Sequence, residues 1–267
     1  AKYNYILIFS SDDTMNLDAL MTYNEVIENV KTTEKDNLLI CSSVNIIDGN
    51  SKKYDYWDRG VFHNLEPIEN YKNLDHLNKI NKYDGTKILK FILPKFSVPG
   101  PFMSTLFSKS LYQKVGGYSS VNLIGPDAHF SYKCLFTGCD LVFCDIPLFN
   151  YRIHQGGQIN LTKKHKNINV LIDRYIFSNL YSDSQLKKIG MTRDDYINAI
   201  VETYGVRSII WSLANWDWSF SLRQFFFMLA AYPGNLFRNI KIYPIILLLI
   251  LGPFSMFLLS FIKSFKK

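Results

Sequence analysis

The chain has 267 residues, of which 48% are hydrophobic and 20% charged. This length suits one large domain or one domain with an appendage, and the composition excludes a disordered or collagen-like chain. The net charge of +7 comes from the second part, because residues 151–267 hold 15 Lys and Arg against 6 Asp and Glu, whereas residues 1–150 hold 15 against 17. A basic region beside a long apolar run is more typical of a membrane surface than of a nucleic-acid site.

Strand and helix patterns alternate over the first 90 residues. The apolar run Tyr5–Phe9 predicts an inner strand that is covered on both faces. A helix pattern follows, and its predicted apolar face comprises Leu17, Leu20, Met21, Val26, Ile27 and Val30. Short strands are predicted over 38–41 and 44–47, the second of which enters a turn at Asp48-Gly49. Residues 50–90 are polar and predict a variable excursion with some helix.

The alternation continues to about residue 157. A strand is predicted over 102–107 and another over 141–144. Helices are predicted over 108–115 and 127–137, since Gly116-Gly117 and Gly138 mark their ends and Pro126 marks the start of the second. These patterns predict an α/β fold with a sheet flanked by helices.

The remainder is helical and basic. Helices are predicted over 170–180, 194–213 and 219–231, and the last is rich enough in Phe to lie in a membrane interface. Ile242–Ile262 has 21 residues without a charge, and as a helix it would span about 31 Å. We expect a transmembrane helix, or a re-entrant hairpin broken at Gly252-Pro253; the alternative is a buried core hairpin. Basic residues flank both ends, so orientation stays open.

The four cysteines, Cys41, Cys134, Cys139 and Cys144, form no C-x-x-C pair and have no clustered histidines. This pattern argues against a structural zinc site and a disulfide framework. We expect core cysteines in a protein of a reducing compartment.

Three acidic or imidazole positions are candidates for chemistry. Asp12-Asp13 follows a predicted strand, where two carboxylates suit a divalent cation that holds a diphosphate; the alternative is a helix N-cap. Asp127 at a helix start suits a general base, or alternatively an acid that the helix dipole favours. His154 suits a metal or phosphate ligand, or alternatively a loop histidine. His129 is expected to pack or to lie at the surface.

The order of these segments carries a resemblance. A strand leads into Asp12-Asp13, then come Lys114-Val115-Gly116-Gly117-Tyr118, Asp127 at a helix start, and Tyr151-Arg152-x-His154. Over residues 5–157 this order resembles family 2 glycosyltransferases of the GT-A fold. The resemblance implies a partial GT-A fold, Rossmann-like with a mixed sheet flanked by helices, followed by a helical region with a membrane segment. It also implies that the N-terminal nucleotide-binding portion of the family is absent from this sequence.

The resemblance also implies roles for these residues. Asp12, Asp13 and His154 would hold Mg²⁺ or Mn²⁺ against the diphosphate of a UDP-, GDP- or dTDP-sugar. Asp127 would take the proton from the acceptor hydroxyl in an inverting displacement. Two positions depart from the family pattern: Ser10 stands where a further Asp is common, and Pro126 replaces a Glu.

We therefore expect a catalytic region at 1–157, a helical, basic, membrane-proximal region at 158–240 and a membrane segment at 241–267. The expected enzyme transfers a sugar to a hydroxyl of a surface-polysaccharide or lipid-linked glycan, such as an O-antigen, on the cytoplasmic face of the bacterial inner membrane. Its expected partners are a nucleotide sugar, the acceptor and membrane lipids, with no nucleic acid. The alternatives are transfer to a polyprenyl phosphate and a non-catalytic membrane-associated partner.

Overall fold

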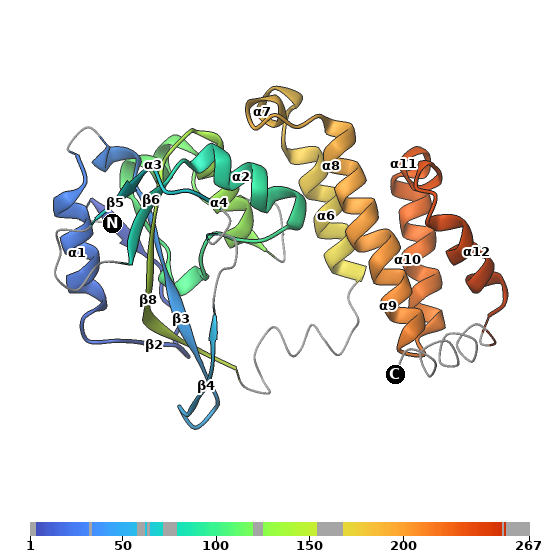
Figure 1. Ribbon diagram of the computed structural model, residues 1–267, viewed down its shortest axis with the longest axis horizontal. Coiled ribbons are helices and arrows are strands. Elements are labelled where there is room, and N and C mark those ends of the chain that lie inside the picture. Colours follow the sequence, from blue (N-terminus) through green and yellow to red (C-terminus); the bar gives the residue numbers. More distant parts are fainter. Residues whose placement is uncertain are drawn as a thin grey trace. The chain divides into compact units, whose positions relative to one another are not determined.

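The computed structural model describes residues 4–31, 34–57, 62, 65–71, 79–119, 125–153, 168–252 and 254. The chain forms two compact units, residues 1–161 and 162–267. The first contains the sheet and the second is helical (Figure 1).

The first unit is built on one mixed sheet. Among the described residues the strand order is β1 (Tyr5–Leu7), β7 (Leu106–Ser108), β3 (Leu39–Ile47), β8 (Leu141–Arg152), β6 (Ile80–Tyr83) and β5 (Glu69–Asn70). The short β2 (Thr14–Met15) also pairs with β8, and β4 (Lys53–Trp57) pairs with β3. The central pair β3 and β8 is parallel, whereas the other pairs are antiparallel. The predicted α/β class with a mixed sheet is confirmed, and the finer GT-A assignment stays a prediction.

Helices cover both faces of the central strands. Ile40 and Val44 of β3 belong to the cluster that contains Tyr23 and Val26 of α1 (Ala19–Asn29). Figure 1 shows α1 on one side of β3 and β8, and α2 (Gly85–Ile92) and α4 (Pro126–Phe136) on the other. Because side chains alternate along a strand, coverage on both faces accounts for the unbroken burial of residues 39–44 in β3 and 141–144 in β8.

The first strand departs from the prediction. Tyr5–Leu7 is half-buried and Phe9 is 41% exposed. Strand β1 pairs with β7 and begins the strand order of the described sheet, so the prediction of an inner strand is wrong. The length of an apolar run reports burial of side chains, whereas the number of neighbouring strands depends on pairings far away in sequence.

The buried face of α1 also differs from the predicted one. Ala19, Tyr23, Val26 and Val30 are buried, whereas Leu20 and Met21 are 52% and 61% exposed. The buried positions follow a spacing of four, three and four residues, which is a single helical stripe. The predicted face was wrong at its N-terminal end, because the large apolar side chains of Leu20 and Met21 were taken as buried in place of the small Ala19.

The helix ends follow local chemistry. Helix α3 (Lys109–Lys114) starts after Ser108, whose Oγ accepts a hydrogen bond from the backbone N–H of Leu111 at 3.1 Å. Gly116, Gly117 and Gly138 all have positive φ, of 71°, 63° and 78°. The predicted stops after α3 and α4 are confirmed, because glycine enters this left-handed region without a Cβ clash.

The second unit is helical throughout its described part. Its segments are α6 (Ile168–Leu180), α7 (Asp183–Lys188), α8 (Arg193–Ile200), η5 (Val201–Arg207), α9 (Ser208–Ala214), α10 (Trp218–Ala231), α11 (Pro233–Arg238) and α12 (Ile242–Ile250). Segment η5 is a π-helix that joins α8 to α9 without a break. The predicted helix over 194–213 is therefore confirmed, with a wider turn in its middle.

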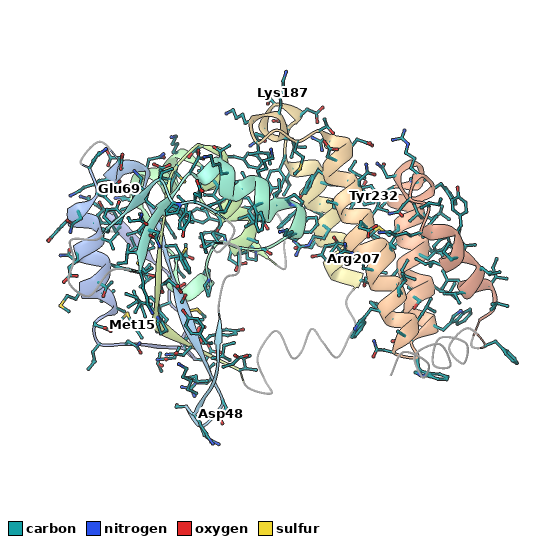
Figure 2. All side chains as sticks on the ribbon, in the orientation of Figure 1. Met15, Asp48, Glu69, Lys187, Arg207 and Tyr232 are labelled. Carbon is teal, nitrogen blue, oxygen red and sulfur yellow. The ribbon has the colours of Figure 1, made fainter. Side chains whose placement is uncertain are left out.

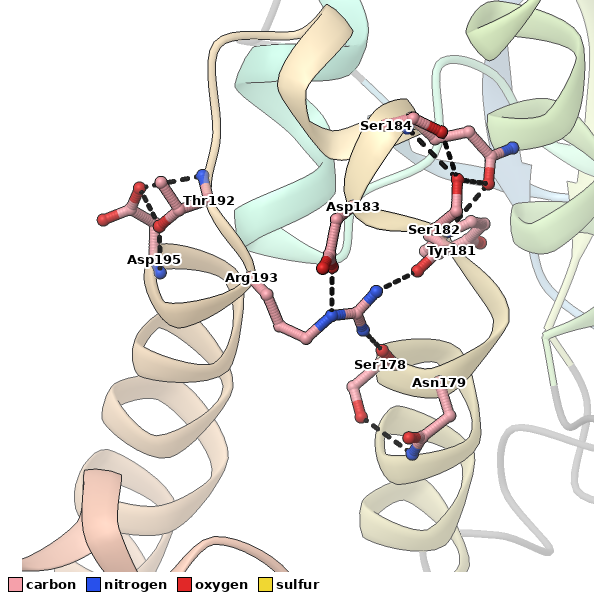
Figure 3. A network of polar contacts seen from close by, with 10 residues as sticks. Ser178, Asn179, Tyr181, Ser182, Asp183, Ser184, Thr192, Arg193 and Asp195 are labelled. Carbon is pink, nitrogen blue, oxygen red and sulfur yellow. Dashed lines mark hydrogen bonds and ion pairs between the residues drawn. The ribbon is translucent and has the colours of Figure 1, made fainter.

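Arg193 links the turns between the first three of these helices (Figure 3). Its Nε donates to Asp183 Oδ1 at 2.6 Å, and its two terminal nitrogens donate to the backbone carbonyls of Ser178 and Tyr181. Helices end with unsatisfied carbonyls, so a guanidinium at this place satisfies the end of α6. The adjacent Thr192 and Asp195 form a capping box at the start of α8.

The predicted break in the C-terminal apolar run is present. Helix α12 has nine residues, about 13 Å of rise, and Gly252 follows it with a φ of 59°. Throughout the described ranges, no helix combines the length and hydropathy needed to cross a bilayer. Residues 253 and 255–267 lie outside the described residues.

Candidate functional site

The Asp12-Asp13 segment lies against the end of β8. Strand β2 follows directly and places Thr14 opposite Asn150 and Met15 opposite Phe149. The backbone N–H of Arg152 donates to Asp13 Oδ1 at 2.9 Å, between residues 139 positions apart in sequence. Asp13 is 7% exposed, while Asp12 is exposed. The structure thus brings the acidic pair and the Tyr151-Arg152 segment together, as their common place at strand ends predicts.

The guanidinium of Arg152 extends this contact to a third segment. Its Nε donates to the backbone carbonyl of Asp12 at 2.8 Å. Its Nη1 donates to the carbonyl of Asp48 at 2.9 Å and to Ser51 Oγ at 3.0 Å. Figure 2 shows Met15 and Asp48 at the same, lower end of the sheet. A planar guanidinium with several donors suits such a junction. The sequence placed Arg152 in a motif but gave no sign of this linking role.

The helix N-cap alternative for Asp12 and Asp13 is wrong. Helix α1 begins at Ala19 with Asp18 at its N-cap position, and β2 separates the acidic pair from the helix. Asp13 instead fixes the end of β8, and the Asp12 carboxylate accepts a hydrogen bond from Ser10 Oγ. Ser10, the departure from the family pattern, is therefore a partner of the acidic segment.

A row of amides lies next to this segment. Asn45 Nδ2 on β3 donates to Asn150 Oδ1 on β8 at 2.8 Å, and Asn150 Nδ2 donates to Thr14 Oγ1 and Asn16 Oδ1, each at 3.0 Å. Asn45, Asn150 and Thr14 are paired positions on β3, β8 and β2, so these groups lie side by side across the sheet. Sequence reasoning missed them, because isolated Asn residues within strand patterns carry no spacing signal.

Asp127 is half-buried in the first turn of α4. Gly125 occupies the N-cap position and has no side chain to cap the helix, so a first-turn carboxylate stabilises this end. Burial, and then the Asp127 charge, raise the pKa of Tyr118 well above its usual value. Asp127 and Tyr118 are therefore electrostatic neighbours. The general-base role of Asp127 stays a prediction.

The two histidines have different outcomes. His129 is 5% exposed, and burial followed by the nearby Lys133 charge lowers its pKa to about 4. It is neutral at pH 7, and the expectation of a packing residue is confirmed. His154 lies outside the described residues, so its ligand role stays a prediction.

The donor set for a cation is partly described. Asp12 offers an exposed carboxylate, and Asp13 adds a second one beside it whose Oδ1 accepts from Arg152. Carboxylate oxygens completed by water are the ligands that Mg²⁺ and Mn²⁺ prefer, so these two residues fit such an ion. Within the described ranges, no three Asp, Glu, His or Cys residues form a group that could hold a metal ion. The Mg²⁺ or Mn²⁺ site therefore stays a prediction.

The cysteines are core residues, as predicted. Cys41, Cys134, Cys139 and Cys144 are all buried free thiols. Burial raises the pKa of Cys139 to about 12, so this thiol is protonated and unreactive at pH 7. The compartment in which the protein resides stays a prediction.

Comparisons with known proteins give distant structural likeness only. No family model and no curated protein matches the chain. Among solved structures, the chain is similar to the crystal structure of S. aureus TarS residues 1–349, with 12% identity and a TM-score of 0.37. The match covers 84% of this chain and 65% of that one, so the chain spans about two thirds of its length. At this distance only the chain's own residues can indicate its function.

Proposed function

We propose that the chain is an inverting glycosyltransferase, which moves a sugar from a nucleotide-sugar donor to a hydroxyl of a glycan acceptor. The observation that carries the proposal is the hydrogen bond from the Arg152 backbone to Asp13, 139 positions apart in sequence. It joins two of the segments whose order resembles family 2 glycosyltransferases. The pair also lies at the carboxyl end of a strand, which is where α/β proteins bind their ligands.

Each residue has a proposed role. Asp12 and Asp13, with His154, would hold Mg²⁺ or Mn²⁺, which when bound offsets charge on the leaving diphosphate. Arg152 is a positioning residue, because its donors bind the Asp12 carbonyl and the turn at Asp48. Asp127 would accept the proton of the acceptor hydroxyl while that oxygen attacks the anomeric carbon.

The donor and acceptor belong to the proposal as classes. The donor would be a UDP-, GDP- or dTDP-sugar, and the acceptor a surface polysaccharide or lipid-linked glycan. Because nucleotide sugars are made in the cytosol, the proposed location is the cytoplasmic face of the bacterial inner membrane.

The test is a turnover assay of the full chain with a panel of nucleotide sugars, Mn²⁺ and glycan acceptors, read as release of nucleoside diphosphate. Asp127→Asn should lower turnover by about 10²-fold or more, and Asp12→Asn should lower it through weaker Mn²⁺ binding. Asp18→Asn is the matched control, because Asp18 is exposed and makes no side-chain cap bond. Full activity of Asp127→Asn would contradict the base assignment.

The exposed apolar residues of the second unit favour one further candidate, transfer to a polyprenyl phosphate. A phosphate acceptor is already ionised and needs no base. Asp127→Asn would then keep its activity on phosphate acceptors and show none on hydroxyl acceptors. A chain that binds no nucleoside diphosphate with Mn²⁺ in calorimetry would instead be the non-catalytic partner.

A further inference from the structure

Helix α12 is apolar on every side. Its inner face is buried, with Ile242, Ile245 and Leu249 at 0%, 1% and 5% exposure. Its outer face is equally apolar, yet Leu247 is 59% exposed and Ile250 76%. A helix on the surface of a water-soluble protein carries polar residues on its outer side, whereas a helix that is apolar all round belongs in a core or in lipid.

The exposed apolar side chains continue past the end of α12. Leu251 is 45% exposed and Phe254 79%. Trp218 Nε1 donates to the carbonyl of Leu249 at 3.1 Å, which joins the start of α10 to the end of α12 and brings the α9–α10 turn to the same place. We call the following six residues the apolar surface: Trp216, Tyr243, Leu247, Ile250, Leu251 and Phe254. Trp and Tyr are the side chains typical of membrane interfaces.

The contact between α9 and α10 has its polar groups inside. Gln224 is 2% exposed; its Nε2 donates to Ser208 Oγ at 2.6 Å, and its Oε1 accepts from Ser212 Oγ at 3.2 Å. On the other side of α10, Phe226 is 59% exposed. Helices in lipid pack through small residues and hydrogen bonds between polar side chains, because their apolar side chains gain nothing from turning inward.

The charge of the second unit complements an anionic bilayer. Residues 162–267 hold 14 Lys and Arg against 6 Asp and Glu, a difference of +8. Arg223 on α10 and Arg238 before α12 are exposed. Basic residues beside an exposed apolar face are attracted to anionic headgroups while the apolar side chains enter the acyl boundary. The short α12 fits within one interface.

We propose that the apolar surface inserts into the interface of a bilayer that contains anionic phospholipid. The second unit then lies on the membrane through α12 and the α9–α10 turn. This binding does not depend on the proposed sugar transfer, because it uses no residue of the Asp12–Asp13 edge. Turnover of a sugar nucleotide with a soluble acceptor, and binding to vesicles, can each fail without the other.

The test is flotation of the full chain with phosphatidylcholine vesicles, with and without phosphatidylglycerol. The wild type should float with the mixed vesicles and much less with phosphatidylcholine alone. Leu247→Gln/Ile250→Gln should lower partitioning at least about tenfold, since two exposed aliphatic side chains lose their transfer into lipid. The matched control is Ile172→Gln on α6, where Ile172 is also exposed, at 41%; it should change partitioning less than about twofold.

Three results would overturn the proposal. The first is unchanged flotation of the double variant, and the second is an equal loss in Ile172→Gln. The third is a dimer of the lipid-free wild type by light scattering that the double variant abolishes, because the surface would then bind a second copy. Circular dichroism checks folding, and Ile250→Gln alone, at the more exposed of the two substituted positions, serves as the milder variant.

Discussion

Asp13 is predicted to hold the fold together as well as to bind a cation. Its carboxylate accepts the Arg152 N–H at 2.9 Å and is 7% exposed. Asp13→Ala leaves this backbone donor without its partner, and a hydrogen bond to a charged acceptor contributes about 1.5–3 kcal/mol. Asp13→Asn keeps an oxygen at the same place and loses only the charge, so its cost should be about 1 kcal/mol. Asp12→Ala removes an exposed carboxylate and should change stability by less than about 0.5 kcal/mol.

Native-state hydrogen exchange measures these costs within the first structural unit alone, which is needed because the two units can unfold separately. Peptides covering β8 and β3 report the opening free energy of the sheet, and the peptide with Arg152 reports the amide bound by Asp13. Calorimetry with Mn²⁺ on the same variants reports cation binding. Both alanine variants should lose Mn²⁺ affinity, and Asp13→Ala alone should also lose protection in β8.

An equal loss of protection in Asp12→Ala and Asp13→Ala would refute the role given to the Asp13 hydrogen bond. Equal destabilisation of Asp13→Asn and Asp13→Ala would refute it as well, since the retained oxygen would then contribute nothing. In either case the hydrogen bond to the Arg152 backbone would not be what fixes Asp13.

Three further predictions concern stability. Burial lowers the pKa of His129 to about 4, below its unfolded value of 6.5, so the unfolded state binds the proton first. The free energy of unfolding should therefore fall by about 2 kcal/mol between pH 7 and pH 5. Denaturant titrations should show this part of the loss absent in His129→Gln, and a pH profile unchanged by that substitution would contradict the prediction. Arg193→Gln removes a 2.6 Å ion pair with Asp183 and two carbonyl contacts, which should cost about 1–3 kcal/mol by hydrogen exchange in α6. Gly100→Ala would place a Cβ at 2.3 Å from the Cys41 Cβ and should cost about 1–3 kcal/mol in chemical denaturation, whereas Gly49→Ala, with nothing within 4 Å, should be near neutral.

Local sequence signals predicted the helices and strands themselves better than they predicted which strands lie next to each other. The glycines after α3 and α4 and the alternation of strands with helices were sufficient, because capping and side-chain periodicity act within a few residues. The place of β1 at the start of the strand order was not predictable in this way. It depends on the pairing with β7, in which Ile6 lies opposite Phe107, 101 positions later. An apolar run looks the same in the sequence whether its strand lies at the edge or inside a sheet.

The place in the fold of the acidic pair, though not its role, was predictable from a strand end. Asp12-Asp13 follows β1 as predicted, because an apolar run and the polar residues that end it are both visible in the sequence. The N-cap alternative failed because β2 intervenes before α1. The part played by Arg152 depends on the turn at Asp48, 104 positions away. No spacing rule connects these two residues, because only the parallel pairing of β3 and β8 brings them together.

Helix α10 shows why hydropathy alone does not choose the buried face. Its sequence is dense in Phe, so either face could pack, yet the buried side includes Ser221 and Gln224 while Phe226 is 59% exposed. In water, turning Phe226 outward and Gln224 inward forgoes burial of apolar area, and only the hydrogen bonds to Ser208 and Ser212 offset the loss. Against lipid the same orientation costs nothing, because an outward Phe stays in an apolar medium while the polar groups are satisfied inside. The orientation of α10 therefore agrees with the bilayer interface proposed for α12.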